Sequence, residues 1–231
     1  MSKNILLIGG SHGIGYALAK KLVERNHTIY IASRTKEQLE GLPITHLPFD
    51  VSTQDVASMV LPERLDGFVY LPGSINLKPF KMLSLDTFRE DMELNFFGLV
   101  KVLKKVLPLM TQGSSTVFYS TVAVGTGMPF HASVAAAKGA LEGFTKSLAA
   151  EYAPNIRVNC VAPSLVDTPL AQRLLNNDKK REMMSERHPL KRFGNPEDIA
   201  NLTAFLLADD SSWITGQIIG VDGGLSTLNV S

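Results

Sequence analysis

The 231-residue sequence has only one cysteine and almost no net charge. Cys160 cannot form a disulfide within the chain, so nothing indicates an oxidising compartment. It stands in an apolar stretch, where a buried, inert thiol is expected rather than a nucleophile. Lys and Arg number 23 against 22 Asp and Glu, which leaves a formal charge of +1. That balance gives no electrostatic reason to expect nucleic acid or an anionic membrane as a partner.

The sequence also lacks long apolar runs. The first apolar run, Ile5–Ile8, is too short for a signal peptide, and no later run is long enough to span a membrane. We therefore expect a soluble, cytoplasmic protein. Its composition, 45% apolar and 19% charged, is ordinary for a globular chain. The length suits one domain, and no repeat, low-complexity tract or linker divides it, so we predict a single domain over residues 1–231.

Short β-type segments alternate with helical segments from end to end. Several of the β-type segments are apolar almost throughout, as expected for strands that helices cover on both faces. The expected strands are 4–8, 28–32, 44–48, 67–71, 115–120, 156–161 and 217–221, and the expected helices are 14–25, 85–110, 132–152 and 196–208. This alternation predicts an α/β fold, a Rossmann-type doubly wound parallel sheet of about seven strands with helices on both faces. The charged segment 179–187 is interpreted as an exposed helix over the site, able to move as a lid.

A glycine-rich turn follows the first expected strand and leads into an amphipathic helix. Its glycines permit a tight turn, let backbone N–H groups approach a pyrophosphate, and bring the helix close to the strand. A glycine pattern alone is weak evidence, but this position at the start of an alternating chain makes it strong. The turn predicts a dinucleotide site formed by Gly9, Ser11, His12, Gly13, Ile14 and Gly15.

The end of the second expected strand indicates which dinucleotide binds. A carboxylate there would accept from the 2′-hydroxyl of NAD and repel a 2′-phosphate. This chain has Ser33 and Arg34 instead, a small hydroxyl and a guanidinium suited to phosphate, and His12 could add a further donor. We therefore predict that the cofactor is NADP(H).

The succession of motifs resembles the classical short-chain dehydrogenase/reductase family over nearly the whole chain. The glycine turn matches the family's Thr-Gly-x-x-x-Gly-x-Gly pattern, with Ile8 in place of threonine. The segments 192–200 and 215–224 are very similar to the branch of acyl-carrier-protein ketoreductases. The resemblance implies hydride transfer between a nicotinamide cofactor and a small-molecule substrate, and assembly into a homotetramer or homodimer. It also implies further cofactor contacts at Asp50, Val51, Gly73, Pro163, Val166 and Thr168, besides Lys138.

The family's catalytic residues are only partly matched. The family uses an asparagine, a serine, and a tyrosine four residues before a lysine; the tyrosine passes the proton to or from the substrate oxygen. Asn95 matches the asparagine, Lys138 the lysine, and Thr121 offers a hydroxyl in place of the serine. Val134 occupies the position of the tyrosine, and its side chain has no proton to give. Loss of a positioned general acid typically lowers the rate by about 10²- to 10⁴-fold.

His131 is the candidate for a substitute acid, because it precedes Lys138 by seven residues and can share its helix face. Enoyl reductases in the family similarly place their tyrosine seven residues before the lysine. His131 could equally cap the helix or face water. Ser133 is rotated away from that face, and Tyr119 is better interpreted as a packed core residue.

Two functions follow. The first is an NADP(H)-dependent oxidoreductase that acts on a carbonyl or activated double bond with atypical proton delivery. The second is a non-catalytic NADP(H)-binding sensor or scaffold protein. The retained Asn95, Thr121 and Lys138 favour the enzyme, although Lys138 also holds cofactor ribose in the family.

Overall fold

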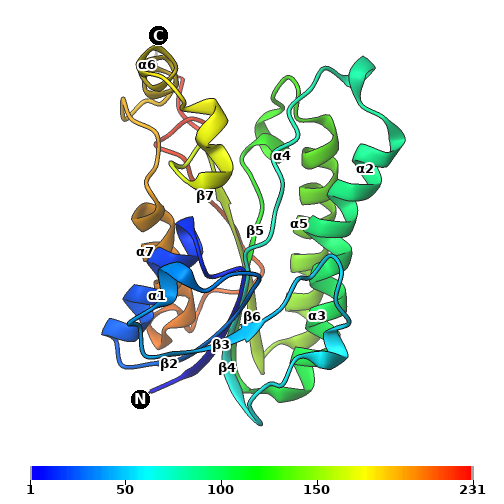
Figure 1. Ribbon diagram of the computed structural model, residues 1–231, viewed down its shortest axis with the longest axis vertical. Coiled ribbons are helices and arrows are strands. Elements are labelled where there is room, and N and C mark those ends of the chain that lie inside the picture. Colours follow the sequence, from blue (N-terminus) through cyan, green and yellow to red (C-terminus); the bar gives the residue numbers. More distant parts are fainter. Residues whose placement is uncertain (1, 230–231) are drawn as a thin grey trace.

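Seven parallel strands form one sheet in the computed structural model, which describes residues 2–229 (Figure 1). Their spatial order is β3-β2-β1-β4-β5-β6-β7. The strands are β1 (Asn4–Ile8), β2 (Thr28–Ser33), β3 (Ile44–Pro48), β4 (Leu65–Tyr70), β5 (Met110–Tyr119), β6 (Ile156–Pro163) and β7 (Ile218–Val221). The predicted Rossmann-type α/β fold is confirmed.

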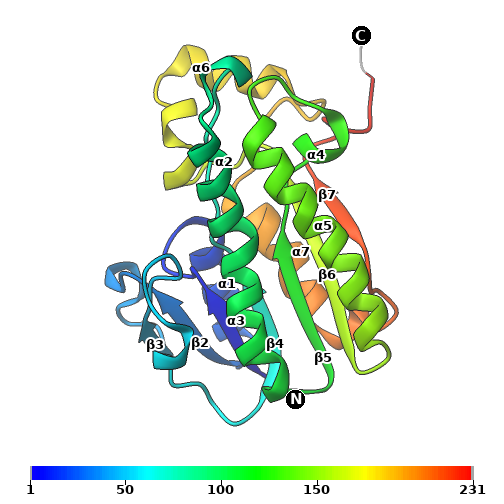
Figure 2. The same cartoon turned by 90° about the vertical axis from the view of Figure 1, so that its right-hand side faces the viewer.

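Helices cover both faces of this sheet. Figures 1 and 2 show α1 (Gly13–Glu24) and α7 (Pro196–Leu207) on one face, with α2 (Leu85–Met92), α3 (Gly98–Val106) and α5 (Ala132–Tyr152) on the other. Successive residues of β1 point to opposite faces, so Ile5 and Leu7 join the core beneath α1 and α7, whereas Leu6 and Ile8 join the core beneath α3 and α5. This two-sided burial explains why the strand is apolar without alternation.

The helix expected over 85–110 is wrong in its interior and at its end. After α2 the backbone widens into a π-helical turn, Glu93–Phe97, before α3 begins. The Tyr70 hydroxyl donates to the Leu94 carbonyl at 2.7 Å, so one carbonyl of the turn bonds outside the helix. A short 3₁₀ turn, Leu107–Leu109, follows α3 and contains Pro108, whose ring cannot continue an α-helical ladder. Met110 already belongs to β5.

The predicted start of α7 is confirmed. Asn195 caps the helix and Pro196 is its first residue, while Asp198 completes a capping box with Asn195. The predicted exposed helix near residues 179–187 is α6 (Asp178–Glu186), which buries none of its residues. A short helix, α4 (Ala123–Thr126), follows β5.

The direction of winding reverses between β1 and β4, which are neighbours in the sheet. In open parallel sheets, ligands bind at this switch point, beyond the carboxyl ends of the strands. Across residues 2–229, no helix combines the length and the apolar character needed to cross a bilayer.

Candidate active site

A cavity of about 940 Å³ lies at the carboxyl ends of the central strands. The segments that follow β1, β2, β4, β5 and β6 line it, together with the start of α5 and part of α6. The predicted site residues that line it are Gly9, Ser11, His12, Gly13, Ile14, Gly15, Ser33, Arg34, Asp50, Val51, Gly73, Thr121, His131, Lys138, Pro163, Val166 and Thr168. Asn95 is the one predicted site residue that does not line the cavity.

The glycine turn has a shape that only glycines allow. Gly13 begins α1 with a positive φ of 53°, in the left-handed region. A Cβ on Gly15 would lie 2.7 Å from the Gly9 carbonyl oxygen, inside van der Waals contact with backbone that cannot yield. The close approach leaves the N-terminus of α1 open toward the cavity, where free N–H groups and the helix dipole favour an anion. The turn therefore fits a pyrophosphate.

The end of β2 places an exposed arginine and a buried, hydrogen-bonded serine next to each other. Arg34 is exposed and lines the cavity. Ser33 is buried; its hydroxyl donates to the Thr35 carbonyl at 2.7 Å and lies 3.0 Å from Nε2 of His46. Sequence reasoning missed His46, which comes from β3 and reaches this position through the parallel pairing of β2 with β3. The guanidinium of Arg34 is thus the group best placed for a 2′-phosphate.

Two other residues predicted to contact the cofactor, Asp50 and Ser11, make local hydrogen bonds. One oxygen of Asp50 accepts from the Ser52 backbone N–H at 2.9 Å, which leaves the second oxygen for another donor. The Ser11 hydroxyl lies 2.9 Å from Nδ1 of the exposed His12. Both are compatible with a bound nucleotide.

Lys138 lies at the opposite end of the cavity. It is only 6% exposed on α5, and its Nζ donates to the backbone carbonyl of Tyr119 at 2.7 Å. Burial lowers the pKa of Lys138 to about 8, since the charged ammonium is removed from water. One helical turn earlier, the Val134 side chain is buried and lines the cavity. Thr121 faces the same cavity, and its hydroxyl oxygen accepts from the Ala123 N–H at 3.3 Å.

Asn95 is fully buried in the π-helical turn. Its Nδ2 donates to Ser74 Oγ at 2.9 Å and to the Asp91 carbonyl at 2.8 Å, while its Oδ1 has no partner among the described residues. A Cβ on Gly73 would lie 3.3 Å from that Oδ1 and 3.4 Å from Lys138 Nζ. Gly73 therefore packs closely against two polar atoms, one of them without a partner among the described residues, at the part of the cavity that Lys138 lines.

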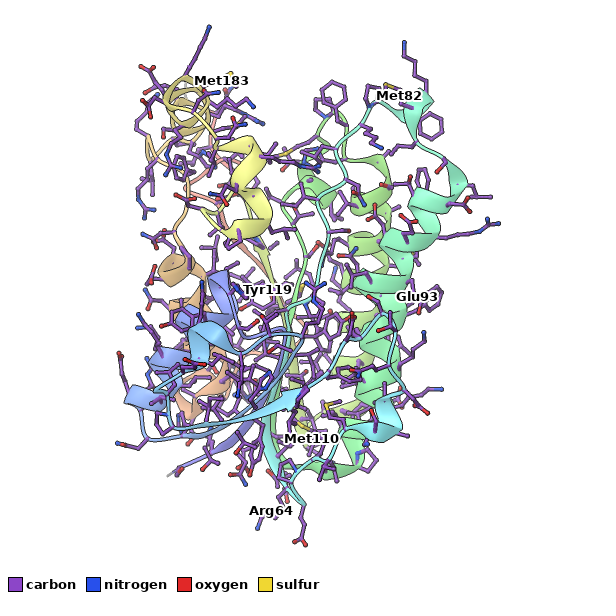
Figure 3. The ribbon with its side chains drawn as sticks, viewed as in Figure 1. Arg64, Met82, Glu93, Met110, Tyr119 and Met183 are labelled. Carbon is purple, nitrogen blue, oxygen red and sulfur yellow. The ribbon has the colours of Figure 1, made fainter. Side chains whose placement is uncertain are left out.

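The two aromatic candidates for proton transfer differ. His131 precedes α5, is partly buried and lines the cavity, with Nδ1 2.8 Å from the Pro129 carbonyl. That contact fixes the proton on Nδ1, so a neutral ring presents an acceptor, not a donor, at Nε2. Tyr119, labelled near the middle of the molecule in Figure 3, has its hydroxyl 2.6 Å from Thr203 Oγ1, and burial raises its pKa. Tyr119 is a packed residue.

Sequence reasoning missed a buried carboxylate behind the cavity wall. Asp91 is 0% exposed on α2 and accepts hydrogen bonds from the side chains of Ser74, Asn76 and Ser133. Ser133 does not line the cavity, in agreement with its expected rotation off the Lys138 face. No motif signals this cluster, because the three donors lie 15 to 42 residues from Asp91 in the chain.

The parallel sheet, its switch point and the glycine turn define a dinucleotide-binding α/β protein of the Rossmann type. Comparison with known proteins narrows this class. A protein-family model described as enoyl-(acyl carrier protein) reductase matches residues 9–226. The chain belongs to the classical short-chain dehydrogenase/reductase family, whose members are nicotinamide-dependent oxidoreductases acting by hydride transfer.

Relatives of several activities share this fold from end to end. A 3-oxoacyl-acyl-carrier-protein reductase of Thermotoga maritima is 34% identical over 96% of this chain and 97% of its own. A 2,5-dichloro-2,5-cyclohexadiene-1,4-diol dehydrogenase of Sphingobium indicum is 30% identical, with 98% of each chain covered. The ligand-free aldohexose dehydrogenase of Thermoplasma acidophilum superposes with a TM-score of 0.89 at 28% identity, covering 100% of this chain and 96% of that one.

Proposed function

We propose that this protein is an NADP(H)-dependent oxidoreductase that transfers hydride to or from a carbonyl or activated double bond of a small organic substrate, with atypical proton delivery. The observation that supports the proposal is one cavity lined by the glycine turn, Arg34 and Lys138, with Val134 in its wall. Residues 1–231 would form one cytoplasmic domain that assembles as a homotetramer or homodimer, as is usual in the family.

The chain's own groups would divide the work between binding and orientation. When bound, the nicotinamide supplies or accepts the hydride. Lys138 holds the ribose beside Gly73, and the hydroxyl of Thr121 orients the substrate oxygen. Val134 contributes only apolar surface where the family has its acid. The proton must therefore come from another group of the cavity wall.

The preference for the 2′-phosphate rests on Arg34. Its side chain is exposed, whereas the Ser33 hydroxyl donates to the Thr35 carbonyl. An arginine can bind a phosphate through two parallel hydrogen bonds and needs no repositioning of the backbone. His12 and Ser33 would serve as secondary contacts.

A specific observation also supports a second candidate, a non-catalytic NADP(H)-binding sensor or scaffold protein. The residues predicted to bind the cofactor line the cavity, and Val134 stands where the family resemblance implies the proton donor. Steady-state oxidation of NADPH with a panel of ketones, quinones and enones separates the two functions. An enzyme consumes cofactor with at least one class of substrate, whereas a sensor binds NADPH and consumes none.

A further inference from the structure

The buried carboxylate of Asp91 has no cation in contact among the described residues. Its Oδ1 accepts from Ser74 Oγ at 2.5 Å and from Asn76 Nδ2 at 2.8 Å, and its Oδ2 accepts from Ser133 Oγ at 2.6 Å. A fully buried carboxylate without an ion pair is uncommon, because desolvation disfavours the charge. Packing alone would be served by an apolar residue at this position of α2. Three hydrogen bonds satisfy the carboxylate, so α2 keeps a buried polar group that packing alone does not require.

Ser74 connects this carboxylate to the cavity. It follows Gly73, and it lines the cavity, whereas Asp91, Asn76 and Ser133 do not. Its hydroxyl donates to Asp91 and accepts from Asn95 Nδ2 at 2.9 Å. A hydroxyl has one hydrogen and two acceptor lone pairs, so one lone pair of Ser74 is still available. Ser74 thus presents a hydroxyl to the cavity and hydrogen-bonds to the buried Asp91 carboxylate behind it.

The position of this pair suits the chemistry beside Lys138. The neighbouring Gly73 lies close to both Lys138 Nζ and Asn95 Oδ1. Asp91 is also close enough for its charge to counter part of the pKa lowering of Lys138. His131, in contrast, presents an acceptor when neutral, since its Nδ1 bonds to Pro129.

We propose that Ser74, backed by Asp91, carries the proton between the substrate oxygen and the protein in place of the missing tyrosine. The inference rests on the proposed oxidoreductase function. In oxidation, the substrate carbon gives up its hydride to the cofactor while its hydroxyl proton passes to the available lone pair of Ser74 Oγ. Ser74 passes its own hydrogen to the carboxylate oxygen of Asp91 to which it donates in the structure. Asp91 then releases that proton through Ser74 to cavity water after product release, and reduction follows the same steps in reverse.

The arrangement supplies its own matched controls. Ser74→Ala and Ser133→Ala each remove one hydroxyl that donates to Asp91, but only Ser74 faces the cavity. We expect Ser74→Ala to lower kcat about 100-fold, as for the loss of a general acid, while Ser133→Ala stays within about threefold of the native value. Ser74→Thr keeps the hydroxyl and should recover most of kcat. The affinity for NADPH, measured by calorimetry, should be unchanged in all three variants.

Asp91 acts through Ser74, so its role is one of positioning and proton supply. Asp91→Asn keeps the size of the side chain and should lower kcat as much as Ser74→Ala, with KM nearly unchanged. The double variant should be no slower than either single variant, because both substitutions interrupt one route. If Asp91→Asn fails to fold, the pair Ser74→Ala and Ser133→Ala still decides the matter.

The results of these experiments distinguish a failure of the proton transfer through Ser74 and Asp91, called the relay below, from a failure of the proposed oxidoreductase function. NADPH oxidation by Ser74→Ala at a rate near that of the native protein overturns the relay and leaves the oxidoreductase standing. Equal losses in Ser74→Ala and Ser133→Ala overturn it too, because the cluster would then be structural. A native protein that binds NADPH but turns over no member of the substrate panel overturns both proposals.

Discussion

The cofactor end and the catalytic end of the cavity are built on different principles. At the cofactor end, backbone geometry dominates: the turn from Gly9 to Gly15 admits no larger residue at its closest approach and aims the N-terminus of α1 at the ligand. At the catalytic end, buried side chains dominate, with Lys138, Asn95 and Asp91 all withdrawn from water. The first end contains the glycine turn that the sequence predicted, and the second contains Val134 where the family resemblance implies a tyrosine. We therefore expect substitutions at one end to impair cofactor binding and substitutions at the other end to change the catalytic rate.

The largest effect is expected from closing the cofactor end. Gly15→Val places a branched side chain against the backbone of Gly9 and Gly10, where even a Cβ would be 2.7 Å from both. The helix must then move away from the strand, and its N–H groups lose the pyrophosphate. We expect NADPH affinity to fall by at least about 1000-fold, roughly 4 kcal/mol. Calorimetric titration of the folded variant measures it, and affinity within tenfold of native would place the cofactor elsewhere.

The second-largest effect is expected from Val134→Tyr, which tests whether Lys138 and Thr121 have the arrangement that the family uses for catalysis. Val134→Tyr places a phenol one turn from Lys138 and close to Thr121, and the ammonium would lower the pKa of that phenol. We expect kcat for generic ketones and quinones to rise about 100-fold, with NADPH affinity unchanged. An unchanged rate would show that the pocket has diverged in shape and that Thr121 no longer orients a substrate oxygen.

His131→Ala accompanies this variant as a test of the imidazole. Because the proposed proton route runs through Ser74 and Asp91, we expect turnover to stay within about threefold of native. A loss of turnover without loss of NADPH affinity would instead assign the proton to His131.

A smaller effect is expected at the adenosine end. The native protein should bind NADPH at least about tenfold more tightly than NADH, roughly 1.4 kcal/mol. Arg34→Asp should reverse that order, because the new carboxylate repels a 2′-phosphate and can accept from a free 2′-hydroxyl. Paired titrations with both cofactors measure the change. Equal affinities in the native protein would contradict the role of Arg34.

The smallest expected effect is a dependence of NADPH affinity on pH, which arises from the charge of Lys138. Burial lowers the pKa of Lys138 to about 8, so its ammonium is present below that pH and is lost as the pH rises through it. The charged form favours the anionic cofactor, and NADPH affinity should therefore weaken above pH 8 by at most about tenfold per pH unit. Lys138→Gln should bind more weakly and show no such slope. The thiol of Cys160 does not interfere, because burial raises its pKa to about 12.

The contrast between the two ends also governs what the sequence could predict. The glycine turn, the strand pattern and Lys138 are local signals, and each indicated its structure from a few consecutive residues. The π-helical turn that holds Asn95 was not foreseen, because it depends on the Tyr70 hydroxyl meeting the Leu94 carbonyl across 24 residues. The Asp91 cluster escaped for the same reason: contacts between distant segments leave no periodic trace in the sequence. The sequence therefore predicted the glycine turn and individual residues such as Lys138, but not the hydrogen bonds between distant segments that hold Asn95 and Asp91.

The most direct test of the account is the rate at which the native protein oxidises NADPH in the presence of the carbonyl panel. The account predicts turnover above the protein-free rate with at least one substrate class, and a lower rate when NADH replaces NADPH. Tight binding of NADPH without oxidation by any member of the panel would contradict it, and would assign the chain to the binding proteins.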